Sequence, residues 1–235
     1  MIPKKLHYVW LGGKPIPSRY RSYIDRWQKM MPDWEIVRWD ETNFDLLQSE
    51  FCRQAYEAKR WAFVSDYIRV NVMYNFGGIY LDVDEEMIQP LYKFALHKAF
   101  FGMEAGNRLQ GGLFGCEKNS PVIGEILVHY NSLEYIKNGQ QDNTVIGTRF
   151  VEVLQDRYPH FQLNEQIQEL EEGVFVYPSR YFCPDLATLK ITEESFTIHR
   201  PMGSWLNSQD KLKKYIYTFI TKIKPFTWLY CKIKR

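Results

Sequence analysis

Two aspartates, Asp82 and Asp84, stand one residue apart directly after a short apolar run at residues 79–81. Side chains two positions apart on an extended strand project to the same side, so these carboxylates can converge on one point. Hard carboxylate oxygens suit Mg²⁺ or Mn²⁺, and such an ion can in turn hold a diphosphate. The preceding pair Gly77-Gly78 allows a sharp turn and the close approach of a ligand. A bare D-x-D pair also occurs as an exposed acidic turn, so other features of the chain must decide.

The chain around this pair alternates between strand and helix patterns. Strands are predicted at residues 6–11, 34–39 and 79–81. Between them lie a helix capped by Ser18 that extends to residue 31, and a helical region that begins at Asn43. A longer helix follows from about residue 52 or 60 to residue 75, with Gly77 as its left-handed cap. This order predicts an α/β fold with a mostly parallel central sheet, in which ligands bind at the carboxyl ends of strands.

The second half of the chain continues with shorter elements. Ser120 is predicted to cap a helix that extends to about residue 136, and Asp142 a helix that extends to about residue 157. Further strands are predicted at residues 99–103, 112–116, 174–177 and 196–199. The chain is therefore interpreted as one domain over residues 1–207 and a tail over residues 208–235.

Composition excludes several classes of protein. The four cysteines are far apart and form no C-x-x-C pair, which favours neither a disulfide framework nor a zinc site and fits a reducing compartment. The first residues contain no long apolar segment, so no signal peptide is expected, and no apolar run of about 18 residues predicts a membrane-spanning helix. The small net charge of +2 does not favour nucleic-acid binding by the whole domain.

Four short motifs occur in order along the chain: Val9-Trp10-Leu11-Gly12-Gly13, Ser65-Asp66-Tyr67-Ile68-Arg69, residues 77–84, and residues 199–205. Together they resemble glycosyltransferase family 32, the D-x-D sugar transferases of bacterial capsule synthesis. Fungal mannosyltransferases and the glucosylating domains of large clostridial toxins share this signature. The resemblance covers residues 1–90 and a block at 196–206, and it implies a GT-A-like, Rossmann-like nucleotide-sugar-binding fold.

The resemblance also implies a donor site. Trp10 would stack on the nucleotide base, Asp66 would bind sugar hydroxyls, and Arg69 would lie beside sugar and phosphate. Residues three apart on a helix share a face, as Asp66 and Arg69 do. Tyr80 would line the same pocket, while Ser204 and Trp205 would close over the diphosphate. Without the resemblance, Trp10 would be interpreted as a core tryptophan, Asp66 and Arg69 as a surface ion pair, and Tyr80 as a packed strand tyrosine.

The same family pattern implies a metal site with Mn²⁺ or Mg²⁺ as the cofactor. Asp84 would be the direct ligand. Asp82 would contact ribose or sugar hydroxyls and reach the metal through water, and both aspartates count as catalytic residues. His199 would supply a third ligand, although a single histidine at a strand end is usually held by ordinary hydrogen bonds.

The acceptor side is assigned by position in related folds and not by motif. Gln110, Gly111, Asp142 and Asn143 lie where such folds place groups that contact sugar or acceptor. The family often carries a Thr-Gly-Pro element in this region, whereas this chain has Ile-Gly-Thr at residues 146–148. Because of this difference from the family, the family pattern does not assign the residues that contact the acceptor.

The expected function is a metal-dependent, retaining glycosyltransferase that moves a hexose from a nucleotide diphosphate sugar, preferably a UDP-sugar. The acceptor would be a glycan or a lipid-linked oligosaccharide in capsular or surface polysaccharide synthesis. One alternative is a D-x-D phosphatase, but that motif expects Thr or Val four residues after its first aspartate, where Glu86 stands. The other is a non-catalytic membrane-surface adaptor with the same fold.

The tail differs sharply from the rest of the chain in charge. From Ser208 onward eight residues are basic and one is acidic, a net charge of +7, against −5 for the remainder. Apolar residues at helical spacing, then aromatic residues and cations, are typical of a helix lying in a membrane surface. The alternative is that the tail packs on the domain as a last core helix, but the separation of an acidic body from a basic tail favours the membrane. The first interpretation predicts a cytoplasmic protein bound peripherally to the inner face of the plasma membrane.

Full-length protein is expected to sediment with anionic liposomes at low salt and to be released as salt rises, because each cation near an anionic leaflet contributes about 1 kcal/mol. A chain ending at Asn207 should stay folded and remain in the supernatant. Unfolding of the shortened chain, or full-length protein that ignores anionic liposomes, would show that the tail is a structural helix.

Overall fold

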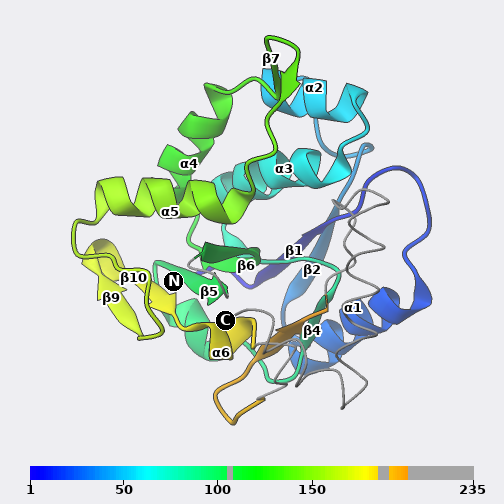
Figure 1. The fold of residues 1–235 in the computed structure, drawn as a ribbon. Coiled ribbons are helices and arrows are strands. Elements are labelled where there is room, and N and C mark those ends of the chain that lie inside the picture. The colour runs from blue at the N-terminus through cyan, green and yellow to red at the C-terminus, as the bar shows by residue number, and fades with distance from the viewer. Residues whose placement is uncertain (105–107, 185–190, 201–235) are drawn as a thin grey trace, which may run out of the picture. The chain divides into compact units, whose positions relative to one another are not determined.

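The computed structural model describes residues 1–104, 108–184 and 191–200, and its central feature is a seven-stranded sheet (Figure 1). In spatial order the strands are β2 (Glu35–Trp39), β1 (Lys5–Val9), β3 (Gly78–Leu81), β6 (Arg108–Cys116), β5 (Ala99–Glu104), β10 (Val174–Tyr177) and β9 (Gln168–Leu170). Strand β1 is parallel to both β2 and β3, and β10 is parallel to β5, whereas β6 and β9 run against their neighbours. The prediction of an α/β fold with a mostly parallel central sheet is confirmed.

Helices cover both faces of this sheet (Figure 1). On one face lie α2 (Glu50–Glu57), α3 (Trp61–Phe76), α4 (Pro121–Asn131) and α5 (Ile146–Arg157). On the other face lie α1 (Ser18–Met30), α6 (Ser179–Phe182) and a two-stranded sheet of β4 (Glu85–Met87) and β11 (Thr197–His199). The remaining short elements are the 3₁₀ turns Tyr92–Leu96 and Glu171–Gly173 and the hairpin of β7 (Ile136–Lys137) and β8 (Gln140–Gln141).

Helix α3 is largely buried between the central sheet and two other helices. It packs on β1, β3 and β6 beneath it and is covered by α2 and α4. Its buried residues are apolar apart from Tyr67 and two charged side chains, Asp66 and Arg69. A buried charge is costly unless it is paired, so these two side chains must find partners within the fold.

Five local predictions are corrected by the structure, and three of them concern helix starts. The region after Asn43 forms turns, because the Asn43 side chain accepts from the backbone N–H of Asp40 and competes with helix formation. Helix α2 begins instead at Glu50. Ser18 is the first helical residue and not the cap, which is Pro17. Asp142 likewise accepts from a backbone N–H in a turn, and α5 starts only at residue 146.

The other two corrections concern helix ends. Gly77 ends α3 with φ 62° but ψ 177°, so it reverses the chain in an extended form that only glycine readily adopts and not in the left-handed helical form. Helix α4 ends at Asn131, five residues earlier than predicted, since residues 133–135 lead directly into the β7–β8 hairpin.

Residues beyond Arg200 lie outside the described part of the chain. Ser204, Trp205, the domain boundary near residue 207 and the basic tail therefore stay predictions. Among the residues that are described, no helix has the length and apolar character needed to cross a membrane.

Replacement of Gly147 by alanine should destabilise the fold. An added methyl carbon would lie 2.0 Å from the backbone oxygen of Leu109, because α5 packs closely on β6. The alanine gains about 1 kcal/mol in helix propensity, but overpacking against a backbone atom costs more, so a net loss of about 1–3 kcal/mol is expected. Urea unfolding measures the difference. Thr148→Ala, the next residue on α5, is the control, and equal midpoints for the two variants would contradict the close packing.

Candidate active site

The site is organised around Arg69, whose side chain is 7% exposed. Its Nη1 donates to the carbonyl oxygen of Gly111 (2.7 Å) and to Oδ2 of Asp82 (3.3 Å). Its Nη2 donates to the Ser65 hydroxyl (3.0 Å) and lies 3.3 Å from Oδ1 of Asp66. One guanidinium therefore joins α3 to the residue after β3 and to β6. The predicted pairing of Asp66 and Arg69 is present and buried, so it is not a surface ion pair.

Tyr80 holds Asp82 from the other side. The Tyr80 hydroxyl donates to Oδ1 of Asp82 (2.7 Å), and the Arg69 guanidinium lies over the Tyr80 ring, 4.7 Å from its centroid. Burial raises the pKa of Tyr80 well above its usual range, so the phenol stays a neutral donor. Both oxygens of Asp82 are thus fixed in direction before any ligand binds.

Asp84 reaches the site through a turn and not through strand alternation, which corrects the geometry expected from the sequence. The N–H of Glu85 donates to the carbonyl oxygen of Asp82 (2.9 Å), closing a turn between β3 and β4. The two carboxylates are nevertheless close enough to interact: burial raises the pKa of Asp82, Arg69 opposes this, and the charge of Asp84 adds to the rise. The two aspartates therefore belong to one turn and not to one face of a strand.

The strand pair β4–β11 brings His199 to the same turn. His199 lies opposite Glu85 in the register, and its Nε2 is 3.5 Å from Oδ1 of Asp84. The neighbouring N–H of Arg200 donates to the Asp84 carbonyl oxygen (2.9 Å). Burial alone would lower the pKa of His199, but the charges of Glu85 and Asp84 outweigh it and hold the pKa well above the usual range.

The donor set fits a divalent cation in part. Among residues 1–104, 108–184 and 191–200, no three His, Cys, Asp or Glu side chains form a group arranged to hold a metal ion. Mg²⁺, however, is commonly held by one or two carboxylates together with substrate phosphates and water. Asp82 and Asp84 match that pattern, since both belong to one turn and the charge of Asp84 raises the pKa of Asp82, an effect that a bound cation would oppose. A third ligand from His199 stays a prediction.

Sequence reasoning missed Glu85, which forms a second polar pair in the site with the predicted residue Gln110. Glu85 is fully buried, and its Oε1 accepts from Nε2 of Gln110 (2.5 Å). Burial raises the pKa of Glu85 to about 8. Within the described residues, Oε2 of Glu85 and Oε1 of Gln110 have no hydrogen-bond partner. The only signal for Glu85 in the sequence is its position directly after D-x-D. The pattern does not distinguish Glu85 from the next residue, Glu86, which is half-buried.

The predicted acceptor-side residues fall into two groups. Gln110 and Gly111 belong to the cluster, since they contact Glu85 and Arg69. Asp142 and Asn143 lie apart from it in their contacts. The Asp142 carboxylate is bonded by the buried Arg149, whereas Oδ1 of Asn143 accepts from Arg60 (3.1 Å). Burial raises the pKa of Asp142, but the Thr144 N–H and Arg149 outweigh it and keep the pKa low. Asp142 thus anchors its own loop.

Trp10 follows β1 at the carboxyl end of the sheet and is only partly buried. Its indole N–H donates to the carbonyl oxygen of Lys14 (2.5 Å), and its backbone N–H donates to that of Trp39 (2.9 Å). The ring is therefore held at the strand end but is not one of the buried core side chains. Stacking on a base stays a prediction.

Comparison with known proteins gives a family match for this part of the chain and a solved structure with a shared fold. Residues 17–101, which include Asp66, Arg69 and both aspartates of D-x-D, match the family described as glycosyltransferase sugar-binding region containing DXD motif. The predicted resemblance to a D-x-D glycosyltransferase family is thereby confirmed. The solved structure of the PaToxG glycosyltransferase superimposes with a TM-score of 0.55 at 19% identity, covering 67% of this chain and 70% of that chain, which shows a shared fold.

Two curated relatives have names that state a related activity. The chain is 24% identical over 138 residues to inositol phosphoceramide mannosyltransferase 3 of Schizosaccharomyces pombe, covering 54% of this chain and 36% of the relative. It is 22% identical over 221 residues to the uncharacterized glycosyltransferase L373 of Acanthamoeba polyphaga mimivirus, covering 87% of this chain and 84% of the relative. The chain thus spans about a third of the fungal relative's length.

Loss of the Arg69 guanidinium should unfold or strongly destabilise the protein. Arg69→Ala leaves Asp66 and Asp82 buried without their counter-ion, which costs about 3–5 kcal/mol. Arg53→Ala is the control, because Arg53 makes two ion pairs of its own, with Glu50 and Glu57, on the exposed side of α2. Chemical denaturation followed by circular dichroism compares the two variants. If both variants unfold at the wild-type midpoint, Arg69 does not hold the site together.

Proposed function

We propose that this chain, which carries the D-x-D sugar-binding region of a glycosyltransferase family, transfers a hexose from a nucleotide diphosphate sugar to a glycan acceptor. The observation that carries the proposal is Asp82, which Tyr80 and Arg69 hold in place beside Asp84 after the end of β3. Ligands of open α/β sheets bind at this end of the strands. The match to the family over residues 17–101 includes all four of these residues.

Asp84 and Asp82 would hold a Mg²⁺ or Mn²⁺ ion, which when bound supplies charge neutralisation for the leaving diphosphate. Arg69 keeps Asp82 oriented and compensates part of its charge in the absence of ligand. The half-buried position of Asp82 leaves its carboxylate accessible, with its side chain 28% exposed. These residues thus prepare the site electrostatically before the donor arrives.

The remaining donor contacts follow from the same arrangement. Asp66 would accept hydrogen bonds from sugar hydroxyls, and burial already raises the pKa of its carboxyl to about 6 although Arg69 opposes this. Trp10 would stack on the base, for which uracil is the preferred choice. Among the described residues we assign no covalent nucleophile, so retention by front-face displacement is the proposed course. Gln110 and Gly111 would face the transferred sugar.

The acceptor and the location are also proposals. The name of the fungal relative contains a lipid, inositol phosphoceramide. A lipid-linked acceptor at a membrane surface is consistent with the basic tail, whose net charge is +7. We place the protein in the cytoplasm, peripherally on the inner face of the membrane, with a role in capsular or surface polysaccharide synthesis.

The test is a donor screen. Purified protein with Mn²⁺ and a panel of UDP- and GDP-sugars should slowly release free nucleotide from one donor, and Asp84→Asn should lower that rate on the order of 10³-fold or more, because the charge that neutralises the leaving group is lost. Asp25→Asn, an exposed aspartate on α1, is the matched control.

Three outcomes would overturn the proposal. Full activity in excess EDTA would exclude the metal. Donor binding without turnover, with every acceptor tried, would favour the non-catalytic adaptor. Release of inorganic phosphate from a phosphoester without sugar transfer would favour the phosphatase.

A further inference from the structure

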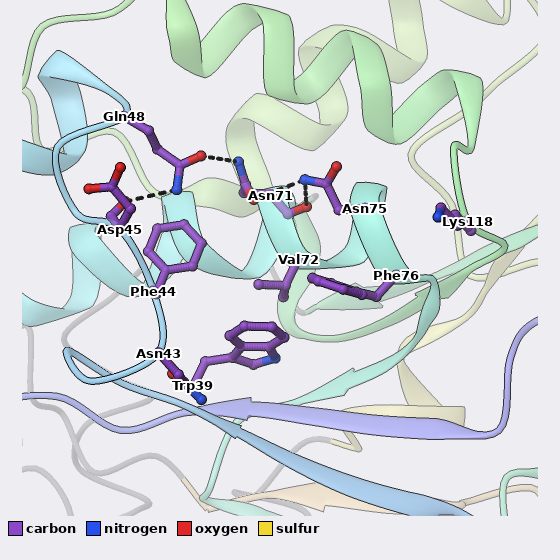
Figure 2. A pocket seen from close by; sticks show the side chains of 10 residues that line it. All are labelled: Trp39, Asn43, Phe44, Asp45, Gln48, Asn71, Val72, Asn75, Phe76 and Lys118. Carbon is purple, nitrogen blue, oxygen red and sulfur yellow. Dashed lines mark hydrogen bonds between the residues drawn. The ribbon is translucent and has the colours of Figure 1, made fainter.

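A pocket of about 410 Å³ lies between the second half of α3 and the loop after β2 (Figure 2). Its volume falls in the range of roughly 300–1,000 Å³ that small-molecule sites occupy. Its lining residues are Trp39, Asn43, Phe44, Asp45, Gln48, Asn71, Val72, Asn75, Phe76 and Lys118. None of them belongs to the cluster around Arg69, and the proposed function makes no use of them.

Three aromatic rings form one side of this pocket. Trp39 lies 5.2 Å from Phe76 between ring centroids, tilted by 32°, and Phe44 meets Trp39 edge-on at 6.4 Å. The Trp39 indole N–H donates to Nδ1 of His7 (3.0 Å), which fixes the ring. Phe76 is 44% exposed although it ends a helix that is otherwise largely buried. The rings therefore offer a rigid apolar surface to a ligand.

A row of amides forms the other side, as Figure 2 shows above the rings. Nδ2 of Asn71 donates to Oε1 of Gln48 (3.1 Å), and Nδ2 of Asn75 donates to Oδ1 of Asn71 (3.0 Å). Each amide oxygen can accept two hydrogen bonds and each NH₂ group can donate two. The row thus fixes the amides in place and leaves hydrogen-bonding capacity on each of them.

The charge of the pocket narrows the class of ligand. Asp45 and Lys118 are its two charged lining residues, one of each sign, and they lie at opposite ends of the pocket (Figure 2). The lining therefore has no net charge and lacks the bidentate arginine contacts that commonly hold a phosphate. A neutral pyranose presents C–H groups on one face, which pack against rings, and hydroxyls at its rim, which pair with fixed amides. We propose that this pocket is a second carbohydrate site, which binds a neutral sugar unit of a glycan away from the D-x-D cluster.

The test is binding of neutral oligosaccharides to the full-length protein without donor or metal. Maltohexaose, cellohexaose and α-mannotriose serve as probes, measured by saturation-transfer NMR and calorimetric titration. At least one should bind in the millimolar range. Phe76→Leu, which keeps apolar bulk but removes the ring, should weaken binding roughly 3- to 10-fold. Asn71→Ala should weaken it as well, and donor hydrolysis should stay unchanged in both variants.

Tyr92→Leu is the matched control, because Tyr92 is 42% exposed, nearly as much as Phe76, and lies outside the pocket. The control should bind the probe as wild type does. The proposal is overturned if wild-type protein binds none of the probes, if both pocket variants bind as tightly as wild type, or if UDP with Mn²⁺ competes with the oligosaccharide. These outcomes do not depend on turnover, so they are separate from a failure of the proposed transferase activity.

Discussion

The burial of one guanidinium is the constraint on which the rest of this structure depends. Arg69 is nearly out of contact with water, yet it is matched by two carboxylates, a carbonyl oxygen and a hydroxyl. Such pairs add little net stability, because desolvation cancels much of the attraction, but an unmatched charge in the same place is very costly. The cost makes the packing of α3 on β3 and β6 specific, since a shift of one helical turn would separate Arg69 from Asp82.

The site also contains more acidic than basic side chains. Four carboxyl groups interact with Arg69, with His199 or with one another: Asp66, Asp82, Asp84 and Glu85. Burial raises the pKa of Asp66 to about 6 and that of Glu85 to about 8. Burial is the main cause of both rises, so it favours the neutral forms of these two carboxyl groups.

Much of the fold could be predicted from the sequence where burial enforces a simple pattern. Strands β1, β2 and β3 and the end of α3 were expected at nearly their observed positions, since apolar runs and glycines mark them. The loop after Asn43 could not be predicted from the sequence. Its composition also suits a helix, but the Asn43 side chain bonds to the backbone of Asp40 and Arg38 and so competes with helix formation. Glu85 was missed for a different reason: its burial depends on partners far away in sequence, such as Gln110.

The candidate site, like the fold, could be predicted only in part. Asp66, Arg69, Tyr80 and Asp82 were recognised from motifs and are joined by direct contacts. The geometry of D-x-D was predicted incorrectly, because alternation along a strand ends at Leu81 and a turn takes over. The pocket beside α3 carries no motif at all. Its rings and amides come from two separated segments, residues 39–48 and 71–76, which only the fold brings together.

The pairing of β4 with β11 also sets an order in time during synthesis. His199 joins the turn of Asp84 from 115 positions later in the chain. At translation rates of about 5–20 residues per second, roughly 6 to 23 s separate the two residues at the ribosome. Throughout that interval the carboxylates of the turn lack their histidine partner, although α3 and β6 emerge far earlier. Arg69 is therefore synthesised before the turn of Asp82 and Asp84, and His199 long after it. A ribosome-bound chain thus passes through a stage in which this acidic turn is present without His199.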